Sequence, residues 1–314
     1  MNLHNYKDDF NDLISIVSSY INIPEDAVRR DYYIVQMMQN LQNSEYADNC
    51  VFKGGTSLSK CYPNSINRFS EDIDLTFIPD ESYSDKQYSK VLKQVESIIT
   101  QGYSIEKIEA ERNSRNKSSY VWPADEDKNT CCVKLEIGSS VRPDPYAKKF
   151  MKTYIQEYLE MQGMNEAVSN FELEIVQVNT LDITRTFIDK VMAVKRHAIC
   201  GTLIEKVRHI YDVTMLLSRP EIKSFLQDTE RLRTLLAETK KTDSFYLSKR
   251  NIAKDYDPVG KYDFFKWMDS FDKNIKNRYE SLHEDLLYTS EKQNFGDAIA
   301  AFQKINSIFS EIGE

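Results

Sequence analysis

The stretch from Val51 to Leu75, VFKGGTSLSKCYPNSINRFSEDIDL, constrains the fold more than any other part of the sequence. It predicts a short apolar strand at residues 50–52, a Gly-Gly turn, and a polar helical segment at residues 56–60. A second strand then carries Asp72 and Asp74 on one face, because successive side chains of a strand point to opposite faces. The chain must therefore fold so that two carboxylates follow a glycine turn on neighbouring elements.

This pattern indicates phosphoryl or nucleotidyl chemistry. Two carboxylates spaced in this way lie roughly 6.5–7 Å apart along the strand, where a cation between them relieves their repulsion. Oxygen ligands of this kind suit Mg²⁺, which proteins hold with one or two carboxylates plus substrate phosphates. Gly54 and Gly55 allow the backbone to approach a ligand, and the amides of a helix N-terminus bind phosphate. The alternative is a structural turn followed by a solvated acidic strand end.

The same residues resemble a known family. Gly-Gly-Thr-Ser at 54–57 followed by Asp-Ile-Asp at 72–74 resembles the signature of the DNA polymerase β-like nucleotidyltransferases. The longer strings KGGTSL at 53–58 and RFSEDIDL at 68–75 resemble the AbiEii/AbiGii toxin family within that superfamily, to which the MenT toxins are related. The resemblance implies an NTP substrate, Mg²⁺ or Mn²⁺, and an antitoxin partner. It also implies nucleotide-binding residues, namely Gly54, Gly55, Thr56, Ser57, Lys60, Arg68 and Lys190.

A third acidic residue follows from the segment at 130–138. Alternation places Val133, Leu135 and Ile137 on one strand face, and Lys134 and Glu136 on the other. The superfamily supplies its third carboxylate at such a place, so the resemblance makes Glu136 a catalytic metal ligand beside Asp72 and Asp74. An exposed charge on an edge strand is the alternative.

The later motifs are RTFIDK at 185–190 and RHIYDV at 208–213, each on a predicted helix. Lys190 borders the apolar stripe of its helix, which by itself is equally typical of a snorkelling lysine. The resemblance makes Lys190 a phosphate-binding catalytic lysine and Asp212 an essential acid. Without it, both residues are equally consistent with an ordinary charge pattern within the helices.

The order of predicted elements gives an α+β fold with a small mixed β-sheet flanked by helices. We expect a nucleotidyltransferase core at residues 1–180 and a mostly helical C-terminal domain at 181–314 that contributes to the active-site cleft. The expected helices cover parts of residues 1–49 and residues 88–99, 150–161, 184–197, 206–217, 218–236 and 282–309. The expected strands cover residues 103–110, 130–138 and 171–178, a hairpin or loop covers 111–129, and a polar, basic and aromatic segment covers 240–262.

Composition narrows the class of protein further. The chain has 314 residues, of which 41% are hydrophobic and 29% charged. It shows no apolar run near the roughly 18 residues that a membrane helix needs and no secretory signal, so we expect a cytoplasmic protein outside the membrane. The five cysteines are odd in number and form no Cys-x-x-Cys pair, which predicts reduced thiols without disulfides.

The net charge of −8 is unusual for a nucleic-acid-binding protein. Its distribution is uneven, with six basic and two acidic residues between Arg185 and His209, so a locally basic cleft is conceivable. Arg112, Arg115 and Lys117, with Tyr120 and Trp122, could contact nucleic acid by charge and stacking from the segment at 111–129, but the sequence favours a plain solvated loop there.

The family resemblance leads to one functional hypothesis, which has two rivals. The resemblance implies a toxin that transfers nucleotides from an NTP to RNA, at the tRNA 3′ end, with growth arrest or phage defence as the outcome. One rival modifies a protein hydroxyl with AMP, and the other is a non-catalytic nucleotide- or partner-binding module. The NTP, the tRNA and the oligomeric state do not follow from the sequence.

Ser70 suggests a regulatory hypothesis. It lies two residues before Asp72 and shares its strand face if the strand extends that far. A phosphate there would add about −1.5 to −2 charge beside the acids and repel the triphosphate or compete for the metal. The alternative is a polar strand or turn residue.

Overall fold

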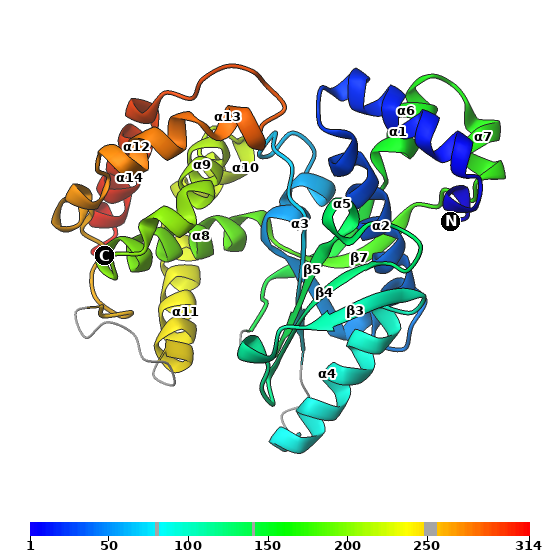
Figure 1. The fold of residues 1–314 in the computed structure, drawn as a ribbon. Helices are drawn as coiled ribbons and strands as arrows, with labels where there is room; N and C mark the ends of the chain where they lie inside the picture. The colour runs from blue at the N-terminus through cyan, green and yellow to red at the C-terminus, as the bar shows by residue number, and fades with distance from the viewer. Residues whose placement is uncertain (79–81, 140–141, 248–255) are drawn as a thin grey trace. The chain divides into compact units, whose positions relative to one another are not determined.

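A computed structural model describes residues 1–78, 82–139, 142–247 and 256–314 of the chain (Figure 1). The chain divides into two compact units. Unit 1 comprises Met1–Pro63 and Phe69–Leu181, and unit 2 comprises Asn64–Arg68 and Asp182–Glu314. The short segment at 64–68 thus leaves the first unit and returns to it immediately before the acidic strand.

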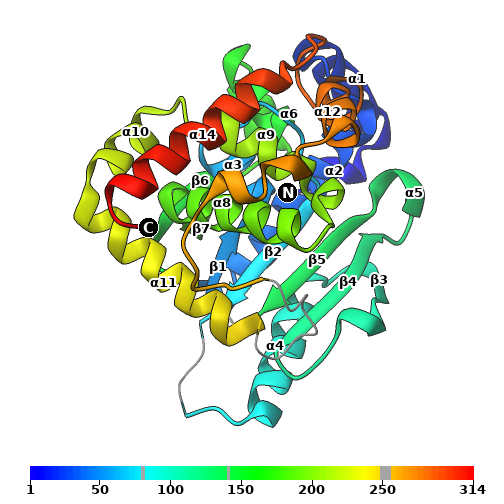
Figure 2. The same ribbon diagram turned by 90° about the vertical axis from the view of Figure 1, so that its left-hand side faces the viewer.

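Unit 1 is built on a seven-stranded mixed sheet with the order β3-β4-β5-β2-β1-β7-β6 (Figure 2). Its strands are β1 (Cys50–Lys53), β2 (Asp72–Phe77), β3 (Tyr103–Lys107), β4 (Asn116–Pro123), β5 (Val133–Gly138), β6 (Tyr146–Met151) and β7 (Val176–Leu181). β2 pairs in parallel with β5 and β1 with β7, whereas the other neighbouring strands are antiparallel. The α+β class with a mixed sheet flanked by helices is therefore confirmed.

Helices flank this sheet. They are α1 (Lys7–Ile21), α2 (Glu25–Gln42), α3 (Gly54–Cys61), α4 (Asp85–Ile99), α5 (Lys128–Cys131), α6 (Tyr154–Met161) and α7 (Asn165–Asn170), with 3₁₀ turns η1 (Leu3–Asn5), η2 (Ala47–Asn49) and η3 (Glu109–Glu111). α2 and α4 pack against each other, α2 against β7, and α4 against β4 and β5. α4 begins at a capping box, in which Ser84 and Gln87 satisfy each other's backbone amides. The apolar residues of β2 and β5 are fully buried, which leaves their charged residues on the opposite face.

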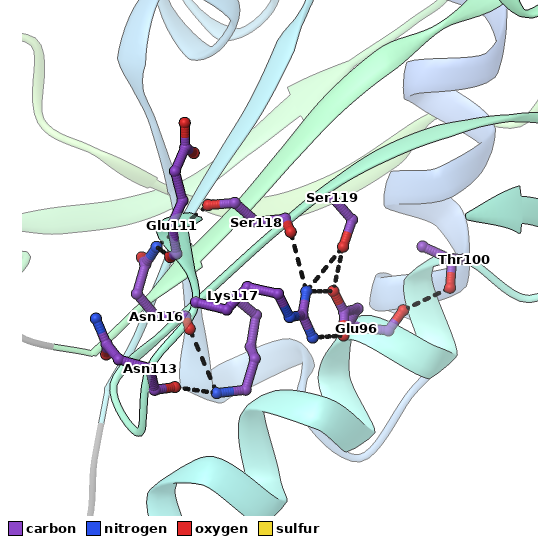
Figure 3. A network of polar contacts seen from close by, with 9 residues as sticks. Glu96, Thr100, Glu111, Asn113, Asn116, Lys117, Ser118 and Ser119 are labelled. Atoms are coloured by element: carbon purple, nitrogen blue, oxygen red, sulfur yellow. Dashed lines mark hydrogen bonds and ion pairs between the residues drawn. The ribbon is translucent and has the colours of Figure 1, made fainter. Parts of the chain in front are cut away.

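The structure differs from several expectations for unit 1. Of the hairpin or loop expected at 111–129, the hairpin is the form observed, because residues 116–123 form strand β4, which pairs in antiparallel fashion with both β3 and β5. Its polar residues have partners within the protein, since Ser119 Oγ donates to the buried Glu96 at 2.6 Å (Figure 3). Residues 146–151, partly assigned to a helix, form strand β6, so that α6 starts only at Tyr154. The strand expected at 171–178 lies at Val176–Leu181.

Unit 2 is helical. Its helices are α8 (Ile183–Ile199), α9 (Val207–Leu216), α10 (Pro220–Gln227), α11 (Thr229–Leu247), α12 (Lys273–Glu280), α13 (Leu282–Asp285) and α14 (Phe295–Glu311), with 3₁₀ turns η4 (Leu203–Lys206), η5 (Phe264–Lys266) and η6 (Met268–Ser270). α14 packs against α9 and α12 (Figure 2). The continuous helix expected at 282–309 is interrupted between α13 and α14. Of the segment expected at 240–262, residues 248–255 lie outside the described residues.

The core of unit 2 relies on aromatic packing. Phe264 meets Trp267, Phe271 and Phe302 with ring centroids 4.7, 5.3 and 5.8 Å apart. Most of these pairs are edge-to-face, the geometry that aromatic quadrupoles favour. No described helix is long and apolar enough to cross a membrane. All five cysteines lie within the described residues and are free thiols.

Candidate active site

The charged faces of β2 and β5 lie side by side in unit 1. The parallel pairing of these strands sets Asp74 opposite Glu136 and Asp72 opposite Lys134. All four side chains are half-buried, while the residues between them are fully buried. We call this set of Asp72, Asp74, Lys134 and Glu136 the acidic face. The structure therefore brings together the three carboxylates that the sequence singled out.

The Gly-Gly turn lies directly against this face. Gly54 has a φ of +85°, a left-handed conformation that residues with a side chain rarely adopt. A Cβ built on Gly54 would clash with the carboxylate of Asp74 and would lie 3.2 Å from its Cγ. Glycine is therefore required twice here, by the backbone conformation and by the approach of Asp74.

The amino end of α3 begins at the same glycine. No described side chain caps this helix at Lys53, so its first backbone amides and the positive end of its dipole are suited to an anion. The hydroxyls of Thr56 and Ser57 are engaged within the protein. Thr56 Oγ1 donates to Ser70 Oγ at 3.0 Å, and Ser57 Oγ donates to the Gly54 carbonyl at 3.0 Å. Backbone amides are thus the groups that this turn offers to a phosphate.

Lys134 adds a cation to the acidic face that the sequence analysis gave no role. Its Nζ lies 2.5 Å from Glu136 Oε1 and 2.9 Å from Glu111 Oε2. Burial works against the charged ammonium, but the hydrogen bonds to Glu136 and Glu111 outweigh it and raise the pKa of Lys134. The alternation at 133–137 already placed Lys134 beside Glu136, and that was the signal that could have found it.

The acidic face fits a divalent cation through Asp72 and Asp74. Both are carboxylates on one strand face, the donor type that Mg²⁺ and Mn²⁺ prefer, and Mg²⁺ takes one or two of them together with substrate phosphates. Among the described residues, no three acidic, histidine or cysteine side chains converge in the way that a closed metal site requires. Glu136, as a third ligand, would have to share its carboxylate with Lys134, which lies 2.5 Å from Oε1, or be released from it.

Two predicted nucleotide-binding cations are held elsewhere by buried acids. Lys60 Nζ lies 2.7 Å from Asp31 and 3.8 Å from the centre of the Tyr154 ring. Burial raises the pKa of Asp31, against the opposing effect of Lys60. Both side chains are almost completely buried in unit 1, so this pair has a structural role whatever else Lys60 does. The other cation, Arg68, belongs to unit 2.

Unit 2 contains a buried cluster of Arg68, Lys190 and Asp212. Asp212 is fully buried and accepts from Arg68 Nε at 2.6 Å and Arg68 Nη2 at 2.8 Å. Lys190 Nζ lies 2.8 Å from Asp212 Oδ2. Desolvation disfavours the Asp212 carboxylate, but the two cations outweigh it and hold its pKa well below the ordinary value. The predicted residues Lys190 and Asp212 are therefore partners, and Arg68 joins them from the segment at 64–68.

Most of the basic residues between Arg185 and His209 form ion pairs or hydrogen bonds with other groups of unit 2. Arg185 pairs with Asp189 at 2.8 Å, and Arg196 with Asp243 at 3.5 Å. Lys195 is buried and donates to the carbonyls of Gly260 and Lys261, and burial lowers its pKa to about 8. With Lys190 on Asp212, four of the six basic groups have defined protein partners, so the charge count does not translate into an equally basic surface.

The fold and the acidic face together define the class of protein as a nucleotidyltransferase. A sequence profile of the AbiEii nucleotidyl transferase toxins of type IV toxin–antitoxin systems matches residues 36–301, so the chain belongs to this family. The family implies an NTP substrate, a divalent metal and an antitoxin partner.

Two solved structures are similar to this chain. MenT4, a nucleotidyltransferase toxin of Mycobacterium tuberculosis, superposes with a TM-score of 0.50 and 15% sequence identity, over 95% of this chain and 98% of that chain, which supports the fold. A protein from H. pylori described as a nucleotidyltransferase gives a TM-score of 0.38 and 17% identity, over 83% of this chain and 98% of that chain. No curated protein sequence matches the chain.

Proposed function

We propose that this toxin transfers a nucleotide from an NTP to the 3′ end of tRNA and thereby blocks translation in the cytoplasm, as growth arrest or phage defence. The observation that carries the proposal is the acidic face beside the amino end of α3, with Asp74 against Gly54 and opposite Glu136. Carboxylates and an uncapped helix N-terminus are what a metal-bound triphosphate needs.

In the proposed reaction, the 3′ hydroxyl oxygen of the RNA attacks the α-phosphorus of the NTP. One phosphorus–oxygen bond forms, the bond from the α-phosphorus to the bridging oxygen breaks, and pyrophosphate leaves. Asp74 or Glu136 takes the proton of the attacking hydroxyl. The backbone at Gly54, Gly55, Thr56 and Ser57 binds the β- and γ-phosphates at the positive end of the α3 dipole.

Asp72 and Asp74, with Glu136 when it is released from Lys134, would hold Mg²⁺ or Mn²⁺. When bound, such an ion neutralises charge on the phosphates and orients the reacting oxygens. Lys60, Arg68 and Lys190 as phosphate ligands, and Asp212 as an essential acid, complete the proposal. Each of these four side chains also holds a buried ion pair, so tests of their function need a stability measurement beside them.

The proposal is tested by incubating the purified protein with total tRNA, Mg²⁺ and each labelled NTP in turn. We expect label on tRNA with one NTP and none on tRNA whose 3′ ribose has been oxidised with periodate. An Asp72→Asn variant, which keeps the size of the side chain and removes its charge, should transfer no label. Label on tRNA that was oxidised with periodate before the incubation would place the acceptor elsewhere than the 3′ end. Absence of label on any RNA would contradict the proposal.

A protein acceptor is the second candidate. The observation that favours it is the net charge of −8 together with the internal pairing of the basic residues of α8, because RNA affinity depends on cations that are available to phosphates. In the same incubation, label from ATP on a protein in place of RNA would support AMP transfer. A protein that binds NTP but labels nothing would support a non-catalytic binding module.

We also propose that phosphorylation of Ser70 switches the enzyme off. Ser70 is 8% exposed and its Oγ accepts from Thr56 Oγ1, two residues into α3. A phosphate on Ser70 would put negative charge next to the helix end that we assign to the triphosphate, and two residues from Asp72.

A further inference from the structure

Lys134 is the positively charged member of an otherwise acidic set. It lies opposite Asp72 in the β2–β5 pairing, and its side chain is 25% exposed. Its ammonium lies 2.5 Å from Glu136 Oε1 and 2.9 Å from Glu111 Oε2. A lysine between two carboxylates is held in place, unlike a surface lysine that extends into solvent.

Glu111, the second partner, is itself fixed by the polar network drawn in Figure 3. Asn116 Nδ2 donates to the Glu111 carbonyl at 2.7 Å and to Ser118 Oγ at 3.2 Å. Next to it, Arg112 donates to the Ser118 carbonyl at 3.0 Å and to Glu96 of α4 at 2.6 Å. The network therefore anchors η3 and β4 to α4, and Glu111 presents its carboxylate to Lys134 from a fixed position.

This arrangement has a consequence for metal binding. One carboxylate oxygen of Glu136, Oε1, is already paired with the Lys134 ammonium at 2.5 Å. A divalent cation that approaches Glu136 competes with this ammonium for the carboxylate and also meets the repulsion of its charge.

We propose that Lys134 is a positioning residue that holds Glu136 off the metal and thereby sets the affinity of the acidic face for divalent cations. The inference rests on the proposed function, because it assigns Asp72, Asp74 and Glu136 to metal binding. In the metal-free protein, Lys134 neutralises Glu136 and Glu111. A bound cation takes over the neutralisation of Glu136, and Lys134 remains with Glu111.

The test measures binding of Mn²⁺ alone to the full-length chain, from the electron paramagnetic resonance signal of free Mn²⁺. We expect Lys134→Met to bind Mn²⁺ about two- to fivefold more tightly than wild type, which is the effect of removing one competing ion pair of ordinary strength. Lys134→Arg keeps the charge and should bind as wild type does. Lys128→Met is the matched control, because Lys128 also lies 2.5 Å from a glutamate, Glu106, outside the acidic face.

A second comparison separates this role from general electrostatics. In a Glu136→Gln background, Lys134→Met should change Mn²⁺ affinity by a clearly smaller factor, since the competing pair no longer exists. Without metal, in the presence of a chelator, Lys134→Met should also have a lower melting temperature than wild type. Addition of Mn²⁺ in place of the chelator should raise the melting temperature of the variant by more than that of wild type. If Lys134→Met fails to fold, Lys134→Gln replaces it.

Unchanged or weaker Mn²⁺ binding in Lys134→Met would overturn the inference, as would an equal gain in the Glu136→Gln background. Absence of Mn²⁺ binding in every variant would overturn it together with the metal assignment. Failure of the proposed function alone gives a different result, namely no label on tRNA while the Mn²⁺ affinities still follow the expected order.

Discussion

The carboxylate of Asp74 lies against the Cα of Gly54, in the space that a side chain at position 54 would occupy. This contact joins the two halves of the motif, because the turn before α3 and the acidic strand β2 are adjacent through the pairing of Lys53 with Asp74. Between Gly54 and Asp74 the chain forms α3 and then the segment at 64–68, which belongs to unit 2, before it reaches the neighbouring strand.

A Gly54→Ala substitution should impair both stability and transfer. The left-handed φ of +85° alone costs about 1–2 kcal/mol for a residue with a Cβ, and the clash with Asp74 adds to it. We expect a lower free energy of unfolding in urea and loss of label transfer. Gly102→Ala is the matched control, since Gly102 has a φ of +87° but no described heavy atom lies within 4 Å of the position that its Cβ would take. Equal effects of the two substitutions would contradict the role of the Asp74 contact.

The buried cluster of unit 2 should make stability depend on Asp212. Asp212→Asn removes the charge that Arg68 and Lys190 neutralise, and breaking a buried pair in this way costs about 3–5 kcal/mol. Lys190→Met leaves Asp212 with its two bonds to Arg68, so we expect a smaller loss. Urea unfolding at pH 7 measures both. A loss for Lys190→Met as large as that for Asp212→Asn would contradict this ranking.

The pH dependence of unfolding gives a second measure of the same cluster. The folded-state pKa of Asp212 is held below its unfolded value, so the stability it contributes is fully present above the unfolded carboxyl value near about 3.9 and is lost as the pH falls through the folded value. The free energy of unfolding of wild type should therefore approach that of Asp212→Asn only in strong acid. A constant difference between the two proteins down to the lowest accessible pH would contradict the assignment.

Charge at Ser70 should inhibit transfer. Ser70→Asp introduces a carboxylate beside the amino end of α3, and we expect label transfer to fall about tenfold or more, equivalent to roughly 1.4 kcal/mol of barrier. Ser70→Asn has the same size without the charge, and Ser70→Ala loses only the bond from Thr56. Both should keep most of the activity. Equal activity of the Asp and Asn variants would argue against an electrostatic switch.

The predictable parts of the fold are those in which periodicity and burial coincide. Strands β2 and β5 follow from strict alternation, and α3 follows from the glycine turn. Strand β4 could not be distinguished from a loop, because residues 116–123 carry Lys117, Ser118 and Ser119, which are residue types typical of solvent-exposed segments, whereas all three are buried. The network around Arg112 and Glu96 satisfies that polar strand, and no local pattern reveals it.

The candidate site likewise has a part that the sequence predicts and a part that it does not. Alternation along each strand placed Asp72 with Asp74 and Lys134 with Glu136, and the pairing of β2 with β5 then fixed their register. The pairing of Asp212 with Arg68 could not be foreseen, because Arg68 lies 144 residues away in the sequence. Its motif position suggested a nucleotide ligand, whereas the structure shows a buried ion pair whose function in transfer is still a prediction.

The most direct test of the acidic face compares Asp74→Asn with Asp85→Asn. Both substitutions remove one carboxylate charge, but Asp85 is on the surface, with its side chain 68% exposed and paired with Arg115. We predict that Asp74→Asn reduces the rate of label transfer from NTP by about 100-fold or more, the scale on which loss of an essential catalytic group acts, with an unchanged melting temperature, and that Asp85→Asn transfers at the wild-type rate. A rate for Asp74→Asn within about threefold of wild type, a difference below about 1 kcal/mol, would contradict the assignment of this face as the active site.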